Sequence, residues 1–297
     1  MTLSHPGELA AMATAVLWAG SAVSFESAGR RIGSLPVNLI RLALASVFLA
    51  LWGLIVHGRP LPLDAPPEAV GWLAASAVAG FVIGDLCLFQ ALVLIGTRLS
   101  MLVMALAPPI AAMIGWAALG ESLSALQAGG MAVTLAGVAW AVLEVRPGSA
   151  VPRRDRVRGV ALGLLGAVGQ ASGLVLSKFG MELWDDPFGA AQVRAIVGVA
   201  GFSVVFAFVG WGRVGRALRD ARGLAWTAVG SVFGPFLGVA MSLLAVRLTH
   251  VGVASTIMAT TPVLVIPVVV LLGRERVSPR AVGAAVLAVA GVAMLFL

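Results

Sequence analysis

The chain has 297 residues, of which 60% are hydrophobic and 11% are charged, and its mean hydropathy is +1.03. An ordinary soluble domain contains about 25% charged residues, so the composition excludes a water-soluble fold. The formal net charge of +7 would suggest a nucleic-acid partner in a soluble protein. Here the positions of the charges indicate orientation in a membrane, so we expect the lipid bilayer and no nucleic acid as a partner.

The apolar residues form ten stretches of about twenty residues each, and about 18 such residues in a row are enough for a helix to cross a bilayer. The connections between the stretches are too short to hold a soluble domain. We therefore expect an all-α integral membrane protein with ten transmembrane helices. The predicted spans are 7–28, 36–57, 68–92, 97–118, 124–144, 158–180, 187–210, 223–246, 251–272 and 279–297.

The arginines are distributed unequally over the connections between these spans. Fifteen lie on alternate connections, beginning with the first, and only Arg59 and Arg247 lie on the others. Short loops rich in Lys and Arg remain cytoplasmic, so we expect a bacterial inner (plasma) membrane protein with both termini outside, in the periplasm. The fifteen are Arg30, Arg31, Arg98, Arg146, Arg153, Arg154, Arg156, Arg158, Arg213, Arg216, Arg219, Arg222, Arg274, Arg276 and Arg280.

The two halves of the chain repeat one another. At a displacement of 154 positions, Trp72, Gly80, Gly84, Ala91, Glu121, Ser124, Gly129 and Gly137 fall on Trp226, Gly234, Gly238, Ala245, Glu275, Ser278, Gly283 and Gly291. At 153 positions, Arg41 falls on Arg194 and Pro109 on Pro262. Each copy has an odd number of spans, so the second copy must be inverted in the membrane. Two inverted five-helix repeats enclose a central cavity that alternating access exposes to either side.

This symmetry predicts the domain organisation. Residues 1–148 form the first five-helix repeat, 149–156 a basic cytoplasmic linker, and 157–297 the second, inverted repeat. Ten spans can enclose a site without a second copy of the chain, so we expect a monomer.

Two segments carry a helix, Gly/Arg-Glu turn and helix pattern. They run from Pro109 to Gln127 (PIAAMIGWAALGESLSALQ) and from Pro262 to Ser278 (PVLVIPVVVLLGRERVS), each followed by spaced glycines. With them the whole chain resembles the drug/metabolite transporter superfamily, in its ten-helix branch with two EamA-type repeats. Within that branch it resembles bacterial exporters of aromatic amino acids. The resemblance implies a membrane exporter of amino acids or other small metabolites.

Polar and aromatic residues in the middle of the spans predict a substrate site. Trp18 and Ser21 stand in the first span, and Gln170 and Ser172 stand at the equivalent place in the sixth. An apolar metabolite needs stacking area and a few hydrogen-bond partners. The predicted substrate-binding residues are Trp18, Ser21, Gly84, Met101, Gln170, Ser172 and Gly234. Packing between helices is the alternative for the same residues, especially for the GxxxG glycines.

Ionisable residues inside the hydrocarbon are costly and therefore indicate function. Arg41 and Asp85 lie at similar depths from the cytoplasmic end, so we expect them to pair, either as part of a gate or only to hold helices together. Arg194 is the counterpart of Arg41, but Val239 stands where a second Asp would be needed. Its expected partner is Glu182, Asp185 or Asp186.

Prolines predict hinge points in three helices, at Pro109, Pro235 and Pro262. Catalysis is not expected, because His5, His57 and His250 lie at or beyond helix ends and no GxSxG motif occurs. A single cysteine, Cys87, and the absence of paired His exclude a typical zinc cage. We therefore expect no catalytic residues, no metal and no cofactor.

Together these features predict an alternating-access transporter that exports amino acids with aromatic or apolar side chains by facilitated diffusion. A proton-coupled drug or metabolite exporter of the same superfamily is one alternative, since Asp85 is the only deep carboxylate. A passive channel is another, although no filter-like sequence or charged ring is present.

Overall fold

A computed structural model describes residues 5–104, 106–144, 153–261, 263–264 and 279–295. Within the helices, a few side chains, those of Glu26 and Met101 among them, lie outside the description. Every element in the described part is a helix.

The described part of the first repeat contains six α-helices and one π-helical segment, η1. They are α1 (Pro6–Ile32), α2 (Ser34–His57), α3 (Pro67–Ala77), η1 (Val78–Gly84), α4 (Asp85–Met104), α5 (Ala107–Leu119) and α6 (Ala125–Glu144). The second repeat contains α7 (Arg153–Leu183), α8 (Pro187–Val209), α9 (Gly212–Ala217), α10 (Ala221–Ser231), η2 (Val232–Gly238), α11 (Val239–Leu248), α12 (Val251–Met258) and α14 (Pro279–Leu295).

Local sequence explains several helix boundaries. Asp186 precedes α8, and its carboxylate accepts hydrogen bonds from the backbone N–H groups of Phe188 and Gly189. Asp220 caps α10 in the same way through the N–H of Gly223. These caps satisfy donors that the first turn of a helix leaves free. Gly58 ends α2 with φ of +70°, a conformation that glycine adopts without strain.

The two π-helical segments lie at equivalent places in the two repeats. A displacement of 154 positions carries α3 onto α10 and η1 onto η2, residue for residue. A π-helical turn widens the helix and is frequent at functional sites. The internal repeat seen in the sequence is therefore also present in the secondary structure, in the third predicted span of each repeat.

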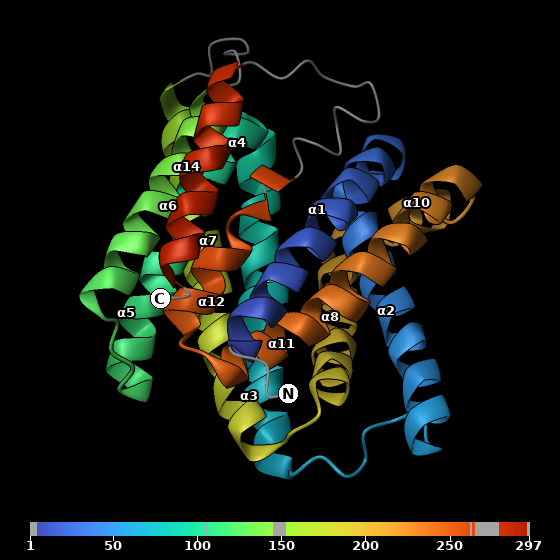
Figure 1. The fold of residues 1–297 in the computed structure, drawn as a ribbon. Helices are drawn as coiled ribbons and strands as arrows, with labels where there is room; N and C mark the ends of the chain where they lie inside the picture. The colour runs from blue at the N-terminus through green and yellow to red at the C-terminus, as the bar shows by residue number, and fades with distance from the viewer. Residues whose placement is uncertain (1–4, 105, 145–152, 262, 265–278, 296–297) are drawn as a thin grey trace.

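The helices form one bundle (Figure 1). In it α6 packs along α14, α4 and η1 along α7, and α1 along α10, η2 and α11. One hydrophobic cluster joins α2, α3, α8 and α11 around Leu42, Leu73, Phe202, Phe206 and Leu243, all of which are fully or almost fully buried. A second cluster joins α1, α5, α7, α11 and α12. These two clusters position the polar residues described below.

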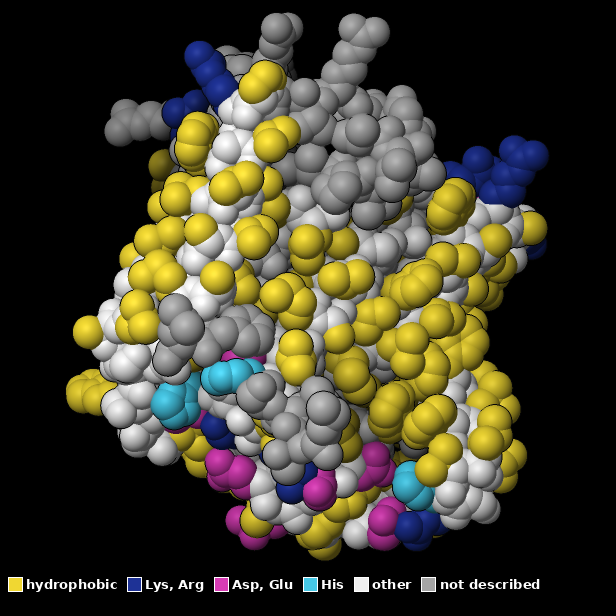
Figure 2. Space-filling model, in the orientation of Figure 1, with side chains coloured by type: hydrophobic (Ala, Val, Ile, Leu, Met, Phe, Trp, Pro, Cys, Tyr) yellow, Lys and Arg dark blue, Asp and Glu magenta, His cyan; other side chains and the backbone are white. Residues whose placement is uncertain are grey.

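The outer surface has an apolar band between two charged ends. Figure 2 shows hydrophobic side chains over the middle of the face, with Lys and Arg at the upper end and with Asp, Glu and His, together with some Lys and Arg, at the lower end. Large apolar side chains such as those of Ile55 and Phe208 are more than 80% exposed. Exposed apolar area on this scale is typical of a surface that faces lipid.

Six described helical segments are long and apolar enough to cross a membrane: Pro6–Ile32, Ser34–His57, Pro67–Leu88, Arg154–Leu183, Pro187–Val209 and Ala221–Leu248. Shorter apolar helices occupy Ala107–Leu119, Ala125–Trp140 and Val282–Met294. The chain is thus a multi-pass, all-helical membrane protein. The predicted ninth span, 251–272, lies largely outside the described residues.

One predicted helix boundary is wrong. The break expected between residues 92 and 97 is absent, because α4 continues to Met104. No proline lies within α4 to end the helix. At the corresponding place in the second repeat, Thr249 has an extended backbone and α11 ends there. Residues 153–156 of the predicted linker 149–156 belong to α7, which begins at Arg153.

Candidate functional site

A buried ion pair joins α2 to the beginning of α4. The guanidinium of Arg41 donates a hydrogen bond to Asp85 Oδ2, and the Asp85 side chain is only 8% exposed. Gln170 Nε2 on α7 donates to the other carboxylate oxygen, Oδ1, at 2.7 Å, and to the carbonyl of Gly80 at 3.3 Å. The pairing of Arg41 with Asp85, expected from their depths, is thus present. Gln170 adds a third helix to it.

Two aromatic rings lie beside the buried arginines. The Arg41 guanidinium is 5.5 Å from the centroid of the Phe25 ring on α1, and that of Arg194 is 4.6 Å from the centroid of Phe81 in η1. Both distances are within the range of cation–π attraction. The deep polar cluster, defined as Arg41, Asp85, Gln170 and Arg194, therefore joins α2, α4, α7 and α8 and touches α1 and η1.

None of the three acidic residues expected as the partner of Arg194 forms an ion pair with it. Asp185 pairs with Arg247, and Asp186 caps α8 and lies 3.8 Å from His57, while Glu182 is exposed. These acids stand at one end of the bundle, whereas Arg194 is two turns into α8 and 5% exposed. Its guanidinium faces η1, where a Cβ added to Gly80 would be 3.7 Å from Nη2.

Glycines bring α7 close to η1. A Cβ added to Gly173 would lie 3.0 Å from Gly80 Cα, and one added to Gly169 would lie 2.9 Å from Gly84 Cα. Neither position has room for a side chain, as in small-residue helix contacts within membranes. Gly84 therefore lies at the contact of η1 with α7, beside Gln170.

The contact between α1 and η2 repeats this arrangement. A Cβ added to Gly234 would lie 3.3 Å from Ser21 Cβ, and one added to Gly238 would lie 2.6 Å from Trp18 Nε1. Trp18 and Gln170 are thus placed alike, each against the last glycine of a π-helical segment. The structure groups Trp18, Ser21 and Gly234 at the first contact, and Gly84 with Gln170 at the second.

The remaining predicted substrate residues are less well defined. Ser21 is buried and donates to the Trp18 carbonyl at 3.0 Å, so its hydroxyl is occupied within α1. Ser172 is partly buried on α7 and has no hydrogen bond within the described part of the chain. The side chain of Met101 lies outside the described residues. Trp18 also packs against the hydrophobic cluster that contains Ala171 and Val175.

The predicted hinge prolines differ in their surroundings. Pro235 lies inside η2. Pro109 lies in the first turn of α5, where proline removes no helical hydrogen bond, so it begins a helix instead of kinking one. Pro262 lies outside the described residues.

A second polar network, which sequence reasoning missed, lies where α1, α7, α11 and the α5–α6 turn meet. Lys178 Nζ pairs with Glu121 Oε1 at 2.5 Å and donates to the Thr249 carbonyl at 3.1 Å. Glu121 Oε2 accepts from the Val251 N–H at 2.8 Å, and the Thr249 hydroxyl donates to Glu8 Oε1 at 2.7 Å. The available signal was that Lys178 is the only lysine in the chain and stands inside an apolar span.

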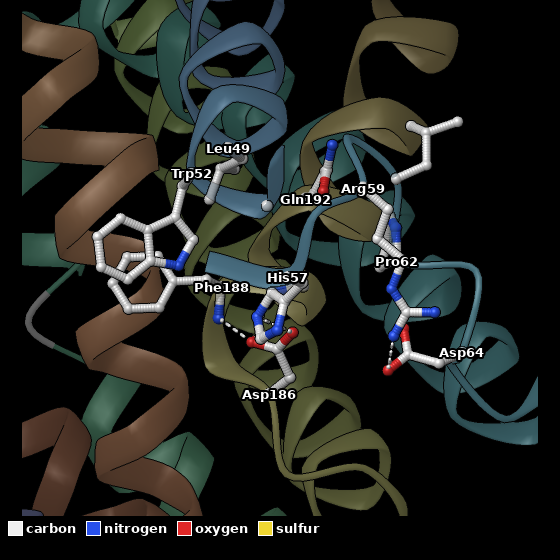
Figure 3. A pocket seen from close by; sticks show the side chains of 12 residues that line it. Leu49, Trp52, His57, Arg59, Pro62, Asp64, Asp186, Phe188 and Gln192 are labelled. Atoms are coloured by element: carbon white, nitrogen blue, oxygen red, sulfur yellow. Dashed lines mark hydrogen bonds and ion pairs between the residues drawn. The ribbon is translucent and has the colours of Figure 1, made fainter. Parts of the chain in front are cut away.

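A surface hollow lies at the end of α2 (Figure 3). Trp52 stacks on Phe188 with 4.6 Å between ring centroids, and Arg59 pairs with Asp64 at 2.8 Å. The first contact ties α2 to the start of α8 and the second lies within the 58–66 connection, while Gln192 Nε2 on α8 donates to the Pro60 carbonyl at 2.7 Å. Neither Trp18 nor Gln170 lines this hollow, so it is separate from the predicted substrate site. Among the described residues, no three His, Cys, Asp or Glu side chains are grouped to hold a metal ion.

Comparison with known proteins agrees with the repeat and the fold. A solved structure described as "Crystal structure of protein" superposes with a TM-score of 0.76 over 98% of this chain and 96% of that chain, at 20% identity. This likeness shows the fold alone. No curated protein sequence is similar enough to match. The profile of the EamA-like transporter family matches twice, over residues 5–143 and 157–297, so together the matches cover nearly the whole sequence. The chain belongs to the EamA-like transporter family and contains two of its repeats.

Proposed function

We propose that this membrane transporter is an alternating-access carrier that exports amino acids with aromatic or apolar side chains. The observation that carries the proposal is the repeated contact of a long helix with a π-helical segment, α1 with η2 and α7 with η1. Because the two contacts are similar, the states in which one or the other is open have similar free energies. One half can then rock against the other and expose a solute bound between them to either side.

Inversion of the second repeat is part of this proposal, and contacts at the helix ends support it. The Lys178–Thr249–Glu8 contacts join the end of α7 to the start of α1. His57 at the end of α2 lies 3.8 Å from Asp186 at the start of α8. These contacts support opposite directions for the corresponding helices of the two repeats, as an inverted repeat requires. Ten transmembrane helices, five in each repeat, complete the proposed architecture.

The proposed substrate site lies between α1 and α7, at the π-helical segments. Trp18 supplies an aromatic face, and Gln170 supplies an amide beside the Asp85 carboxylate. Trp and amide groups together suit a small solute with an apolar body and a polar end. Packing between helices remains the competing function of the same residues, and the variants in the Discussion separate the two.

The two polar networks are the proposed gates. The deep polar cluster joins α2, α4, α7 and α8, whereas the pair of Glu121 and Lys178 joins the α5–α6 turn to α7. Arg31, at the end of α1, pairs with Asp220 at the Arg-rich end, which we assign to the cytoplasm. The Glu121–Lys178 network then faces the periplasm. Opening would require one network to break while the other holds.

Transport is tested with the purified protein in liposomes preloaded with unlabelled phenylalanine. We expect saturable uptake of labelled phenylalanine by counterflow, with competition by aromatic and aliphatic amino acids. An unchanged rate under an imposed pH gradient would agree with facilitated diffusion, and accumulation driven by that gradient would favour proton coupling. Competition by threonine or cationic amino acids without competition by phenylalanine would refute the substrate class. Ionic current without counterflow would refute the carrier.

A further inference from the structure

The deep polar cluster contains more positive than negative charge. Arg41 and Arg194 contribute two guanidinium groups, and Asp85 contributes one carboxylate. Both oxygens of that carboxylate are already engaged, one by Arg41 and the other by Gln170. The described side chains of the cluster therefore carry one unbalanced positive charge.

Arg194 is the less well compensated of the two guanidinium groups, because Asp85 is hydrogen-bonded to Arg41 and acts on Arg194 only electrostatically, without a direct contact. Among the described residues Arg194 makes no hydrogen bond and no ion pair, and its Nε is buried without a partner. The side chain is 5% exposed, and its guanidinium lies over the Phe81 ring, 4.6 Å from the ring centroid. An aromatic face replaces only a small part of the water around a guanidinium, and an uncompensated charge inside the hydrocarbon is costly. Such a group is retained where a ligand supplies the missing charge.

We infer that Arg194 binds the carboxylate of the transported molecule, an assignment that rests on the proposed function. The planar guanidinium matches a carboxylate through two parallel hydrogen bonds. A carboxylate carries a single negative charge, which equals the excess in the cluster. Gly80 lies beside Nη2, and a Cβ added there would be in ordinary contact with Nη2 at 3.7 Å, with Gly173 Cα at 3.7 Å and with Gln170 Oε1 at 3.8 Å, so a carboxylate reaches the guanidinium when η1 moves away from α7.

The position of Arg194 also couples binding to the proposed gate. Its guanidinium lies beside η1, and the first residue after η1 is Asp85. A carboxylate bound at Arg194 would neutralise the cation nearest to the Arg41–Asp85 pair. The same site thus recognises the substrate and senses its charge, whereas Val239 at the position equivalent to Asp85 gives the second repeat no matching carboxylate.

The experiment compares three analogues that share a phenyl ring: phenylalanine, 3-phenylpropionate without the amine, and phenethylamine without the carboxylate. Each competes against labelled phenylalanine in counterflow, and each is tested for a ligand-induced rise of Tm. We expect both carboxylates, and not phenethylamine, to compete and to raise Tm. Arg194→Gln is expected to weaken both carboxylates at least tenfold without lowering the Tm of the unliganded protein, because it removes an unbalanced charge.

Two further variants make the result specific. Arg194→Lys keeps the charge without the planar fork and should bind carboxylates with intermediate affinity. Arg247→Gln removes an arginine that pairs with Asp185 at the end of the bundle, so it should leave the competition unchanged. A purely structural Arg194 would instead lower the unliganded Tm and would reduce transport of all solutes equally.

Equal competition by phenethylamine and 3-phenylpropionate in the wild type would overturn the inference, and this result needs no variant to fold. A carboxylate preference retained in Arg194→Gln would also overturn it, as would stronger competition by phenyl phosphate. If phenylalanine is transported but the protein shows no preference for carboxylates, the role of Arg194 is refuted and the proposed export function is not. A Tm shift with 3-phenylpropionate but no amino-acid flux refutes the proposed export and supports the carboxylate site.

Discussion

Trp18 and Gln170 stand at equivalent positions of the two repeats, and each lies against the last glycine of a π-helical segment, Gly238 for Trp18 and Gly84 for Gln170. The two side chains differ in chemistry although their surroundings match. One contact therefore offers an aromatic face and the other an amide that is bound to Asp85. Internal symmetry supplies the scaffold, and departures from it supply the chemistry.

The buried pair of Arg41 and Asp85 predicts a strong coupling. Asp85→Asn leaves the Arg41 charge without its partner, and breaking a buried pair costs about 3–5 kcal/mol. Removing both charges, in Asp85→Asn with Arg41→Gln, should recover much of this loss. Thermal unfolding in detergent measures both effects. Additive losses in the double variant would contradict a direct coupling.

The matched control for that experiment is the exposed pair of Arg59 and Asp64, whose side chains are 43% and 46% exposed. Exposed ion pairs contribute roughly 0–1 kcal/mol. Asp64→Asn should therefore change the unfolding temperature little. The Arg41–Asp85 interpretation requires a clear difference between the two variants.

The Glu121–Lys178 pair predicts that the periplasmic side opens when it is broken. Thr14 on α1 is fully buried, about one and a half helical turns from Glu8, and can carry a reporter cysteine in a Cys87→Ser background. Lys178→Gln should increase labelling of Thr14→Cys by an impermeant maleimide several-fold, because the α7 contact with the α5–α6 turn is lost. Labelling at the wild-type rate would show that this network does not close the outer side.

The close approach of α7 to η1 predicts a position-dependent effect of adding one methyl group. Gly169→Ala places a Cβ 2.8 Å from the Ala79 carbonyl oxygen, so backbone must move, at a cost of about 1–3 kcal/mol. Gly71→Ala on α3 meets nothing within 4 Å and should be neutral or stabilising by up to about 1 kcal/mol. Comparison of the two unfolding temperatures measures the difference. Equal effects would mean that the contact is looser than described.

The cap of α10 predicts a pH dependence confined to acid. The backbone N–H of Gly223, and then the Arg31 side chain, lower the pKa of Asp220 below its ordinary value. A lowered folded pKa contributes stability that is present above the unfolded pKa of about 3.9 and is lost as pH falls through the folded value. Asp220 should add no change between pH 8 and pH 5.

Asp220→Asn tests this cap, because Asn accepts the same helix hydrogen bond without a titrating charge. The unfolding temperature of the variant should fall less steeply than that of the wild type as the pH falls below about 4. A difference between the two proteins that appears near pH 7 would contradict the assigned cause.

Sequence reasoning reached the features that depend on hydropathy and on depth within a span. The apolar stretches give the membrane class, and the similar depths of Arg41 and Asp85 predict their pair. The repeat of Gly80 and Gly84 in Gly234 and Gly238 marks the segments that prove to be π-helical, but the glycines do not specify a wider turn. That geometry depends on the approach of α7 and α1, which is a property of the folded bundle.

The errors arise from the same limit. The expected partners of Arg194 lie near it in sequence, whereas its guanidinium faces Phe81 in η1. Lys178 and Glu121 are 57 residues apart, and only the packed bundle brings them together. The break expected after residue 92 does not form, because Gly96 and Thr97 weaken a helix without ending it and α4 continues to Met104.

The inverted duplication is tested most directly by the sidedness of two equivalent connections. Leu63, between α2 and α3, is 79% exposed, and Leu218, displaced by about one repeat and lying between α9 and α10, is 55% exposed. Each is changed to cysteine in a Cys87→Ser background and labelled with an impermeant maleimide in intact cells and in inverted membrane vesicles. We predict that Leu63→Cys reacts only from outside and Leu218→Cys only from the cytoplasmic side. Labelling of both from the same side would contradict the inverted repeat and the alternating-access carrier built on it.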